Sequence, residues 1–200
     1  MRLITSADSA STGKSANSTL CSVTLVLVLG GSALVPLIAA ESPPVFRAFN
    51  DRVQEYLKLR KNLQNSLPRR KTTNQHRDIV ERQRAFAAAI RKTRANAKQG
   101  DIFSAEVSDQ FRRVIRDQFA GPSGGEIRKT IRQGEPGQNV DLAVNSVYPE
   151  QKALTTVPPL LLIALPPLPP ELAYRIVDHD LVLQDTEART IVDFIPHAIP

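Results

Sequence analysis

The pattern of apolar and polar residues is clearest in the C-terminal part of the chain. Three short runs rich in β-branched and aliphatic residues occupy positions 173–177, 181–184 and 190–195. The stretches between them, 178–180 and 185–188, are polar enough for tight turns. Because both connections are short, the pattern predicts a three-stranded antiparallel meander.

Amphipathic helices are predicted in the N-terminal half. Apolar residues recur at three- and four-residue steps over residues 45–67 and again over about 74–98, which is the helical period. Gly100 is a natural C-cap for the second helix. The expected apolar stripes are Phe46, Phe49, Val53, Tyr56, Leu57 and Leu63 in the first helix, and Ile79, Gln83, Phe86 and Ile90 in the second.

A third helix is predicted from Ser104, and a short fourth helix at residues 126–133. The Gly/Pro-rich stretch 121–125 ends the third helix. Because the connections are short, the helices should be antiparallel neighbours. We therefore expect an α+β fold, with about three N-terminal amphipathic helices packed on or beside a small C-terminal antiparallel β-meander. The buried face of the third helix should consist of Val107, Phe111, Val114, Ile115 and Phe119.

A proline-rich connector precedes the meander. Residues 140–144 alternate between apolar and polar types, which predicts an additional edge strand of the sheet. Pro159 can open a single helical turn that runs through Leu165. Residues 166–170 are rich in proline and should be extended, polyproline-type backbone.

Residues 1–40 have the organisation of a secretory signal peptide. A basic, Ser/Thr-rich start (1–19) precedes an uncharged apolar run (20–40) that ends in small residues, with cleavage expected after Ala40. The alternative is an uncleaved membrane anchor, because the run reaches the length of about 20 residues that a span needs. The single cysteine, Cys21, lies in this run, so the remainder has no thiol for a disulfide, a zinc ligand or a nucleophile.

These boundaries divide the chain into four parts. Residues 1–40 are the signal peptide or anchor, and residues 41–125 are a basic helical region. Residues 126–172 form a Pro/Gly-rich connector, and residues 173–200 form the β-meander.

Charge is distributed unevenly. The whole chain has a formal net charge of +6, but residues 47–98 carry fifteen Lys/Arg against four acidic residues, a net of +11. Residues 99–200 carry nine basic and fourteen acidic residues, a net of −5. The two halves can therefore attract each other within one molecule, or the basic half can bind an external anion.

Five basic residues recur every seven positions within the basic segment. This spacing keeps them on one side of a helix, where arginine can grip phosphate or carboxylate oxygens through two hydrogen bonds. They form a candidate anion-binding strip, for which a solvated outer face is the structural alternative. The strip consists of Arg70, Arg77, Arg84, Arg91 and Lys98.

One group of residues has side chains of the types that bind metals, but two acidic hairpin turns would produce the same composition. No metal-binding motif is present, and we assign no metal-binding residue. The group consists of Asp178, His179, Asp180, Asp185, Asp193 and His197.

No catalytic motif is present either. The chain has no nucleophile elbow, no Ser-x-x-Lys motif and no phosphate-binding loop, so we assign no catalytic or cofactor-binding residue. Tyr174 and Arg175 can pair with Asp193 across the sheet, and we expect that pairing to be a structural contact.

Several segments resemble a group of uncharacterised exported bacterial proteins. These are residues 97–103, 157–161 and the tail from Leu168 to Ile195, and the resemblance implies a signal peptide and an envelope or secreted location. The tail is also similar to periplasmic accessory proteins of nickel and cobalt homeostasis, which share its proline lead-in and three strands. This chain has Asp178-His179 and Ala188-Arg189 where those proteins have a turn-forming glycine, and Tyr174 where they have tryptophan.

The sequence therefore predicts an exported, non-enzymatic protein of the periplasm or the medium, acting as a binding or accessory module. Its partner is expected to be an anionic envelope component or another envelope protein, and nucleic acid is disfavoured because no aromatic residues interleave the basic ones. Two alternatives remain: a metal-responsive periplasmic accessory protein, and a membrane-anchored envelope protein in contact with lipid through residues 20–40.

Overall fold

A computed structural model describes residues 44–67, 76–133, 141–148 and 155–200, apart from the side chain of His76. All of them belong to one compact unit, Ala40–Pro200. Helices are followed by a four-stranded antiparallel sheet, so the predicted α+β fold class is confirmed. The predicted signal peptide or anchor at 1–40 lies outside the described residues.

Three of the four longer helices follow the predicted pattern: α1 (Pro44–Ser66), α3 (Ala105–Ala120) and α4 (Gly124–Gln133). Proline suits the first turn of α1, because that turn has no intrahelical acceptor for its backbone N–H groups. Gly121 ends α3, and its N–H donates to the Asp117 carbonyl at 2.9 Å. Helix α4 begins two residues earlier than predicted.

The second helix, α2 (His76–Thr93), ends before the predicted terminus at residue 98, and Gly100 is not its C-cap. Gly100 instead has φ of +93° in a turn, where its N–H donates to Asp193 Oδ1 at 3.0 Å. The side chain of Arg94, the first residue after the helix, bonds to the sheet at the Val192 carbonyl. These tertiary hydrogen bonds outweigh the helical preference of the intervening residues.

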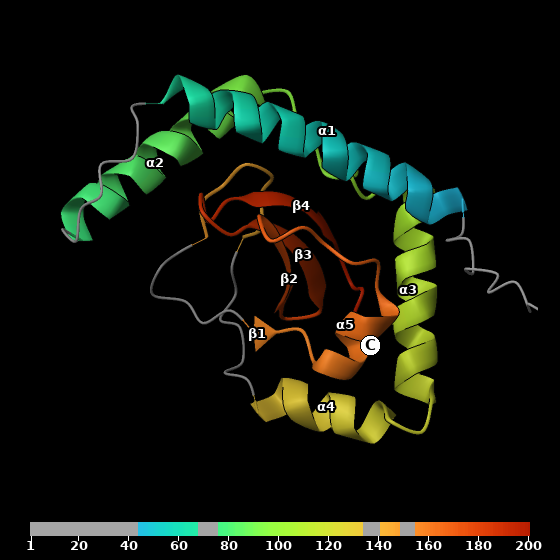
Figure 1. Cartoon of the computed structure of the whole chain (residues 1–200). Coiled ribbons are helices and arrows are strands. Elements are labelled where there is room, and N and C mark those ends of the chain that lie inside the picture. Colours follow the sequence, from blue (N-terminus) through green and yellow to red (C-terminus); the bar gives the residue numbers. More distant parts are fainter. Residues whose placement is uncertain (1–43, 68–75, 134–140, 149–154) are drawn as a thin grey trace, which may run out of the picture. The chain divides into compact units, whose positions relative to one another are not determined.

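The strands β1 (Thr155–Thr156), β2 (Leu172–Val177), β3 (Asp180–Asp185) and β4 (Ile191–Ile195) lie in that order in one sheet (Figure 1). Each pairs with the next in antiparallel fashion, so the predicted meander is confirmed.

The predicted edge strand at 140–144 is wrong for its described residues, 141–144, which form no strand. The edge position beside β2 belongs to β1. Asn145, at φ of 66°, turns the chain, and the residues after it then pair with the opposite edge. There the Ile191 N–H donates to the Ser146 carbonyl, and Val147 forms a bridge with Thr190.

Both faces of the sheet are covered. Alternate residues of β3 point to opposite sides: Leu181 and Leu183 join a core shared with the helices, whereas Val182 packs with Tyr148 on the other face. Segment 141–148 covers that second face through Leu142 and Tyr148.

Aromatic rings fill the junction of α1, α3 and β2. Phe111 makes edge-to-face contacts with Phe49, Phe103 and Tyr174, at centroid distances of 5.1, 5.2 and 5.9 Å. Such contacts add to the apolar burial of each ring, so this cluster links the helices to the sheet. Four of the five predicted core residues of α3 are buried, and Val114 packs at the edge of the core.

A short helix, α5 (Pro159–Ala164), matches the predicted helical turn in the connector. It packs against α3 (Figure 1). Residues 166–169 after it have neither helix nor strand. Among the described helices, none is both long enough and apolar enough to cross a lipid bilayer.

Candidate functional site

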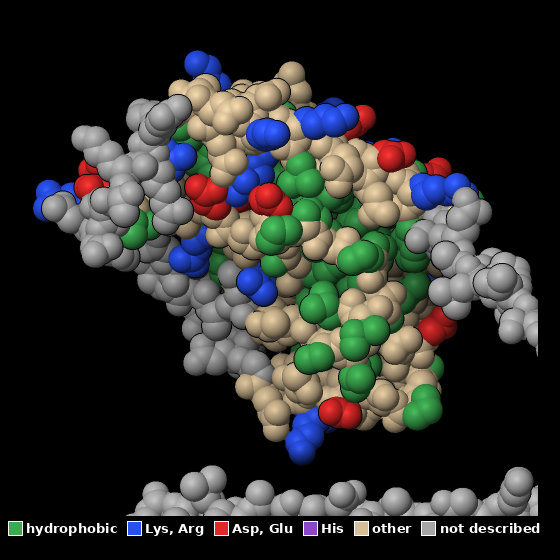
Figure 2. Space-filling model, in the orientation of Figure 1, with side chains coloured by type: hydrophobic (Ala, Val, Ile, Leu, Met, Phe, Trp, Pro, Cys, Tyr) green, Lys and Arg blue, Asp and Glu red, His purple; other side chains and the backbone are tan. Residues whose placement is uncertain are grey.

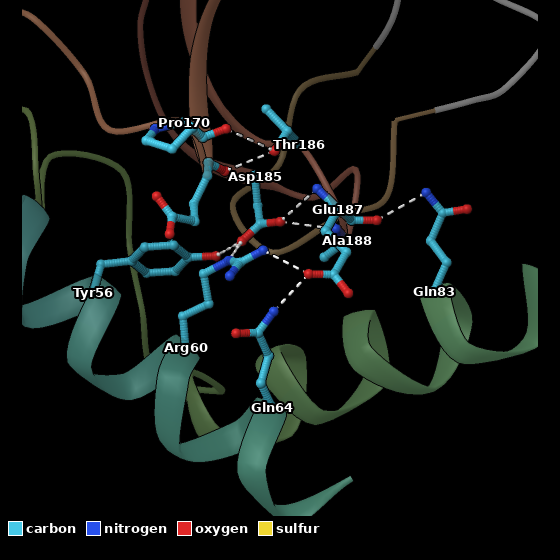
Figure 3. A network of polar contacts seen from close by, with 10 residues as sticks. Tyr56, Arg60, Gln64, Gln83, Pro170, Asp185, Thr186, Glu187 and Ala188 are labelled. Atoms are coloured by element: carbon cyan, nitrogen blue, oxygen red, sulfur yellow. Dashed lines mark hydrogen bonds and ion pairs between the residues drawn. The ribbon is translucent and has the colours of Figure 1, made fainter. Parts of the chain in front are cut away.

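A buried polar network joins the helices to the turn between β3 and β4 (Figure 3). At its centre, the fully buried Asp185 uses both carboxylate oxygens. Oδ2 accepts from the Tyr56 hydroxyl at 2.9 Å and from Arg60 Nε at 2.8 Å. Oδ1 accepts from the backbone N–H groups of Glu187 and Ala188 at 3.0 and 2.8 Å. We call these residues, with Gln64 and Gln83, the Asp185 network.

The outer part of the Asp185 network holds Glu187. Arg60 Nη2 donates to Glu187 Oε2 at 2.8 Å, and Gln64 Nε2 donates to the same oxygen at 2.6 Å. From α2, Gln83 Nε2 donates to the Glu187 carbonyl at 2.9 Å. Side chains of both α1 and α2 therefore bind the turn between β3 and β4.

Arg60 is buried although it is an arginine on an amphipathic helix. Its guanidinium lies 5.2 Å from the centre of the Phe86 ring and pairs with two carboxylates. Burial alone would lower the pKa of Arg60, but Asp185 and Glu187 outweigh it and hold the pKa above its usual value. The Arg60 side chain is thus a permanent cation inside the protein.

Tyr56 is held in its neutral form by the same surroundings. Burial raises the pKa of its hydroxyl, and the charge of Asp185 and the hydrogen bond to it raise that pKa further. Tyr56 therefore acts as a hydrogen-bond donor and not as a proton acceptor at ordinary pH.

Asp193, in the middle of β4, is a second fully buried carboxylate. Oδ2 accepts from the N–H groups of Ile102 and Phe103, both at 2.8 Å, and Oδ1 accepts from those of Gly100 and Phe194 at 3.0 and 2.9 Å. Asp193 thereby fixes the segment between α2 and α3 against the sheet. Four donors on each of the two buried aspartates leave neither carboxylate available as a general base.

Arg94 is a second cation of the basic segment that is bonded within the molecule, although it is only partly buried. Its Nη1 donates to Asn145 Oδ1 at 3.0 Å and to the Val192 carbonyl at 3.2 Å, and its guanidinium lies 5.2 Å from the centre of the Tyr56 ring. Burial lowers the pKa of Arg94. Arg60 and Arg94 thus show that part of the basic segment is used inside the molecule, as the intramolecular alternative predicts.

The candidate metal-binding residues do not converge. Asp185 and Asp193 belong to the contacts described above, whereas His179 Nδ1 lies 3.0 Å from the Ile199 carbonyl. Asp180 Oδ1 accepts from the His197 N–H at 2.9 Å, so this group fixes the last residues of the chain against the β2–β3 turn. Within the part of the chain that the structure describes, no cluster of three or more potential ligands is present.

The predicted pairing of Tyr174 and Arg175 with Asp193 is wrong. The Tyr174 hydroxyl donates to the Pro166 carbonyl at 3.0 Å, and Arg175 Nε lies 3.4 Å from Gln184 Oε1. Tyr174 instead belongs to the aromatic cluster, on the face of the sheet that the helices cover.

The candidate anion-binding strip is shorter than the sequence suggests. Arg77, Arg84 and Arg91 lie on α2 and are exposed, whereas Lys98 lies beyond the end of the helix and Arg70 lies outside the described residues. We call the first three residues the arginine face. Arg91 Nε is 3.5 Å from the Asn145 carbonyl, and among the described residues no ion pair involves any of the three.

Sequence reasoning missed the roles of Arg60, Asp185 and Asp193. The sequence carried a signal for two of them, Arg60 and Asp193. Arg60 continues the buried spacing of Phe49, Val53 and Tyr56 along α1. Asp193 interrupts the apolar run 191–195, a position where an unpaired charge would be strongly destabilising.

No protein-family model matches this chain, and no match was found among curated proteins or solved structures. The resemblances noted from the sequence therefore stay predictions.

Proposed function

We propose that this protein is an exported, non-enzymatic envelope protein that binds an anionic envelope polymer through the arginine face. The observation that carries the proposal is the division of the basic segment. Arg60 is buried and Arg94 is partly buried, and both are bonded within the molecule, whereas Arg77, Arg84 and Arg91 are exposed, and none of these three forms an ion pair with a described residue.

The spacing of the arginine face suits an extended polymer. Residues seven apart on a helix are separated by about 10 Å along its axis, so three guanidinium groups cover about 20 Å. A single small anion can contact only one of these positions. A polymer with a phosphate or carboxylate on each repeat can contact all three, each through paired hydrogen bonds.

The compartment is inferred from the sequence of residues 1–40, where a basic start precedes the uncharged run 20–40. An exported protein meets anionic glycans and phosphate polymers rather than nucleic acid. The buried aspartates support a non-enzymatic role, because both carboxylates are saturated with hydrogen bonds from the chain itself.

The binding test uses polyphosphate and polygalacturonate as probes in titration calorimetry. Replacing Arg77, Arg84 and Arg91 together with glutamine should weaken binding at least about tenfold, because three charge-assisted contacts are lost. The matched control removes three exposed cations elsewhere, Lys58→Gln, Lys61→Gln and Arg113→Gln, and should retain most of the affinity. Equal affinities for the two triple variants would contradict the proposal.

Export is tested separately by the N-terminal mass of the protein recovered from cell fractions. A start at Glu41 in a soluble envelope fraction is expected. Intact protein in the membrane fraction would favour the anchored alternative, and intact soluble protein from the cytoplasm would overturn export.

A further inference from the structure

The stretch 157–170 contains no polar side chain in fourteen residues. Its inward side chains, Val157, Leu161 and Leu165, belong to the main core. Three of its outward side chains on α5 are exposed: Leu160 by 37%, Leu162 by 47% and Ile163 by 82%. We call Leu160, Leu162 and Ile163 the apolar tip.

The backbone holds the apolar tip in a fixed position. The N–H groups of Leu161 and Leu162 both donate to the Pro158 carbonyl, at 3.0 and 2.9 Å. On the other side, the Pro166 carbonyl accepts from the Tyr174 hydroxyl. With Leu161 buried beneath the tip and prolines on both sides, the three side chains cannot turn inward without unfolding α5.

A contiguous apolar surface of this kind marks a contact with another apolar phase or partner. The tip offers no side-chain hydrogen bond, so its partner must be apolar where it touches. Three partly exposed side chains supply far less than the roughly 800 Å² per partner that a stable protein–protein interface buries. A lipid surface needs no complementary shape, and each inserted side chain adds to the buried apolar area that sets the strength of membrane binding.

Helix α3, against which α5 packs, and helix α4, which packs against α3, together carry more cations than acids. Both α5 and α4 pack against α3, and residues 111–133 carry six Lys/Arg against two acidic residues. Figure 2 shows hydrophobic side chains gathered where Figure 1 places α5, and both basic and acidic side chains over α4. Anionic headgroups would meet these cations when the tip enters the interface. The exposed cations are Arg113, Arg116, Arg128, Lys129 and Arg132.

We propose that the apolar tip of α5 inserts into the surface of an anionic lipid bilayer, while the exposed cations of α3 and α4 contact its headgroups. Interfacial helices lie along the membrane surface and bury only their apolar face, by about 5–10 Å, so only the outward side chains of α5 need to enter the lipid. The insertion is peripheral and leaves the sheet and its core unchanged. This surface is distinct from the arginine face of α2.

The test uses the absence of tryptophan from the chain. Leu162→Trp in the full-length protein places a single fluorescent reporter on the tip. Vesicles of phosphatidylglycerol and phosphatidylcholine should shift its emission to shorter wavelength, and phosphatidylcholine brominated near the headgroup should quench it. Ile79→Trp is the matched control, because Ile79 is 46% exposed on α2, and its emission should not change.

Two further variants, made in protein that carries Leu162→Trp, separate the contribution of the apolar side chains from that of the cations. Ile163→Ser should weaken vesicle binding by about tenfold, because the most exposed apolar side chain is lost, whereas Ile79→Ser should not change it. Replacing Arg128, Lys129 and Arg132 with glutamine should weaken the emission shift on anionic vesicles at low salt.

Three results would each overturn the proposal. The first is an unshifted Leu162→Trp emission when the protein is bound to vesicles, which would mean that another segment makes the contact. The second is a shift without vesicles that grows with protein concentration, which would assign the tip to a second copy. The third is loss of the shift when Arg77, Arg84 and Arg91 become glutamine, which would move lipid contact to α2. If the arginine face does not bind a polymer, these three tests of the apolar tip keep their meaning.

Discussion

Asp185 shows how a buried charge becomes a structural element. Its carboxylate accepts two backbone and two side-chain hydrogen bonds, and Arg60 neutralises it at 2.8 Å. Removing one member of a buried ion pair leaves the other uncompensated, which is far more destabilising than breaking a surface pair.

Asp185→Asn should therefore lower the free energy of unfolding by about 3 kcal/mol, because Arg60 loses its closest counter-charge and an amide nitrogen must face a donor. Urea denaturation followed by circular dichroism measures the change. The matched control is Asp109→Asn, which removes the exposed pair with Arg112 and should change stability by less than about 0.5 kcal/mol. Similar losses for the two variants would refute the structural role of Asp185.

Arg189 has a backbone conformation that glycine adopts more easily. Its φ of 53° is left-handed, and the related turn residue Asp178 has φ of 52°. Arg189→Gly should be more stable than Arg189→Ala by about 1 kcal/mol, the reverse of the order in a helix, because a Cβ is strained at this φ. Comparing two truncations cancels the loss of the arginine side chain. Thermal unfolding of both variants gives the order, and a more stable alanine variant would contradict it.

Sequence patterns predict where single apolar residues lie better than they predict the roles of charged residues. Phe111, Ile115 and Phe119 are buried, as the spacing of α3 predicts. The same reasoning placed Asp185 and Asp193 with the candidate metal ligands, because their partners lie in distant segments. Their hydrogen bonds to Tyr56 and Ile102 span 129 and 91 positions of the chain, beyond the reach of any local pattern.

Among the elements, the helix ends differ most from expectation. Helix α2 stops at Thr93, and Gly100 serves a turn that Asp193 holds. The alanine-rich composition of residues 85–97 favours helix, but intrinsic preferences are weak compared with a set of tertiary hydrogen bonds. The meander was predictable because both of its turns are short and polar.

Two glycines should respond to alanine in opposite directions. Gly100→Ala should lower the free energy of unfolding by about 1 kcal/mol, because φ is +93° although the space for a Cβ is adequate. Gly125→Ala should raise it by about 0.5 kcal/mol, because Gly125 lies in α4 and a Cβ there meets nothing within 4 Å. Chemical denaturation of both variants tests the pair, and a change of the same sign in both would refute the assigned turn and helix.

At the scale of the whole molecule, some cations of the basic half form ion pairs and hydrogen bonds with the acidic half. Arg60 pairs with Asp185 and Glu187, and Arg94 bonds to acceptors on Asn145 and β4. The charge imbalance in the sequence suggested this attraction, but it did not indicate which cations turn inward. That choice depends on position: Arg60 continues the apolar stripe of α1, and Arg94 follows the last turn of α2.

Alkali should unfold the protein and ionise Tyr56 and Tyr174 together. Burial raises the pKa of both Tyr56 and Tyr174 above the ordinary value of 10.0. Below pH 10 the folded and unfolded states both keep the hydroxyl protons of Tyr56 and Tyr174. Above pH 10 the unfolded state releases them first, so the free energy of unfolding falls by about 1.4 kcal/mol per pH unit for each tyrosine. Two of the chain's three tyrosines should therefore contribute tyrosinate absorbance only with the loss of circular dichroism. Ionisation of more than one tyrosine while the fold persists would contradict the burial of the Tyr56 and Tyr174 hydroxyls.

The carboxylate of Asp193 also constrains the order in which the parts of the protein fold during synthesis. The N–H groups of Gly100, Ile102 and Phe103 are synthesised about ninety residues before the acceptor that satisfies them. Until the ribosome has added β4, the backbone N–H groups of the segment between α2 and α3 have no carboxylate to bind. Arg60 likewise has no counter-charge until Asp185 has been synthesised. The helices therefore cannot complete their tertiary structure during translation of the N-terminal half. Under the export proposed above, a nascent chain that reached a translocase before its last strand emerged would still be loosely folded.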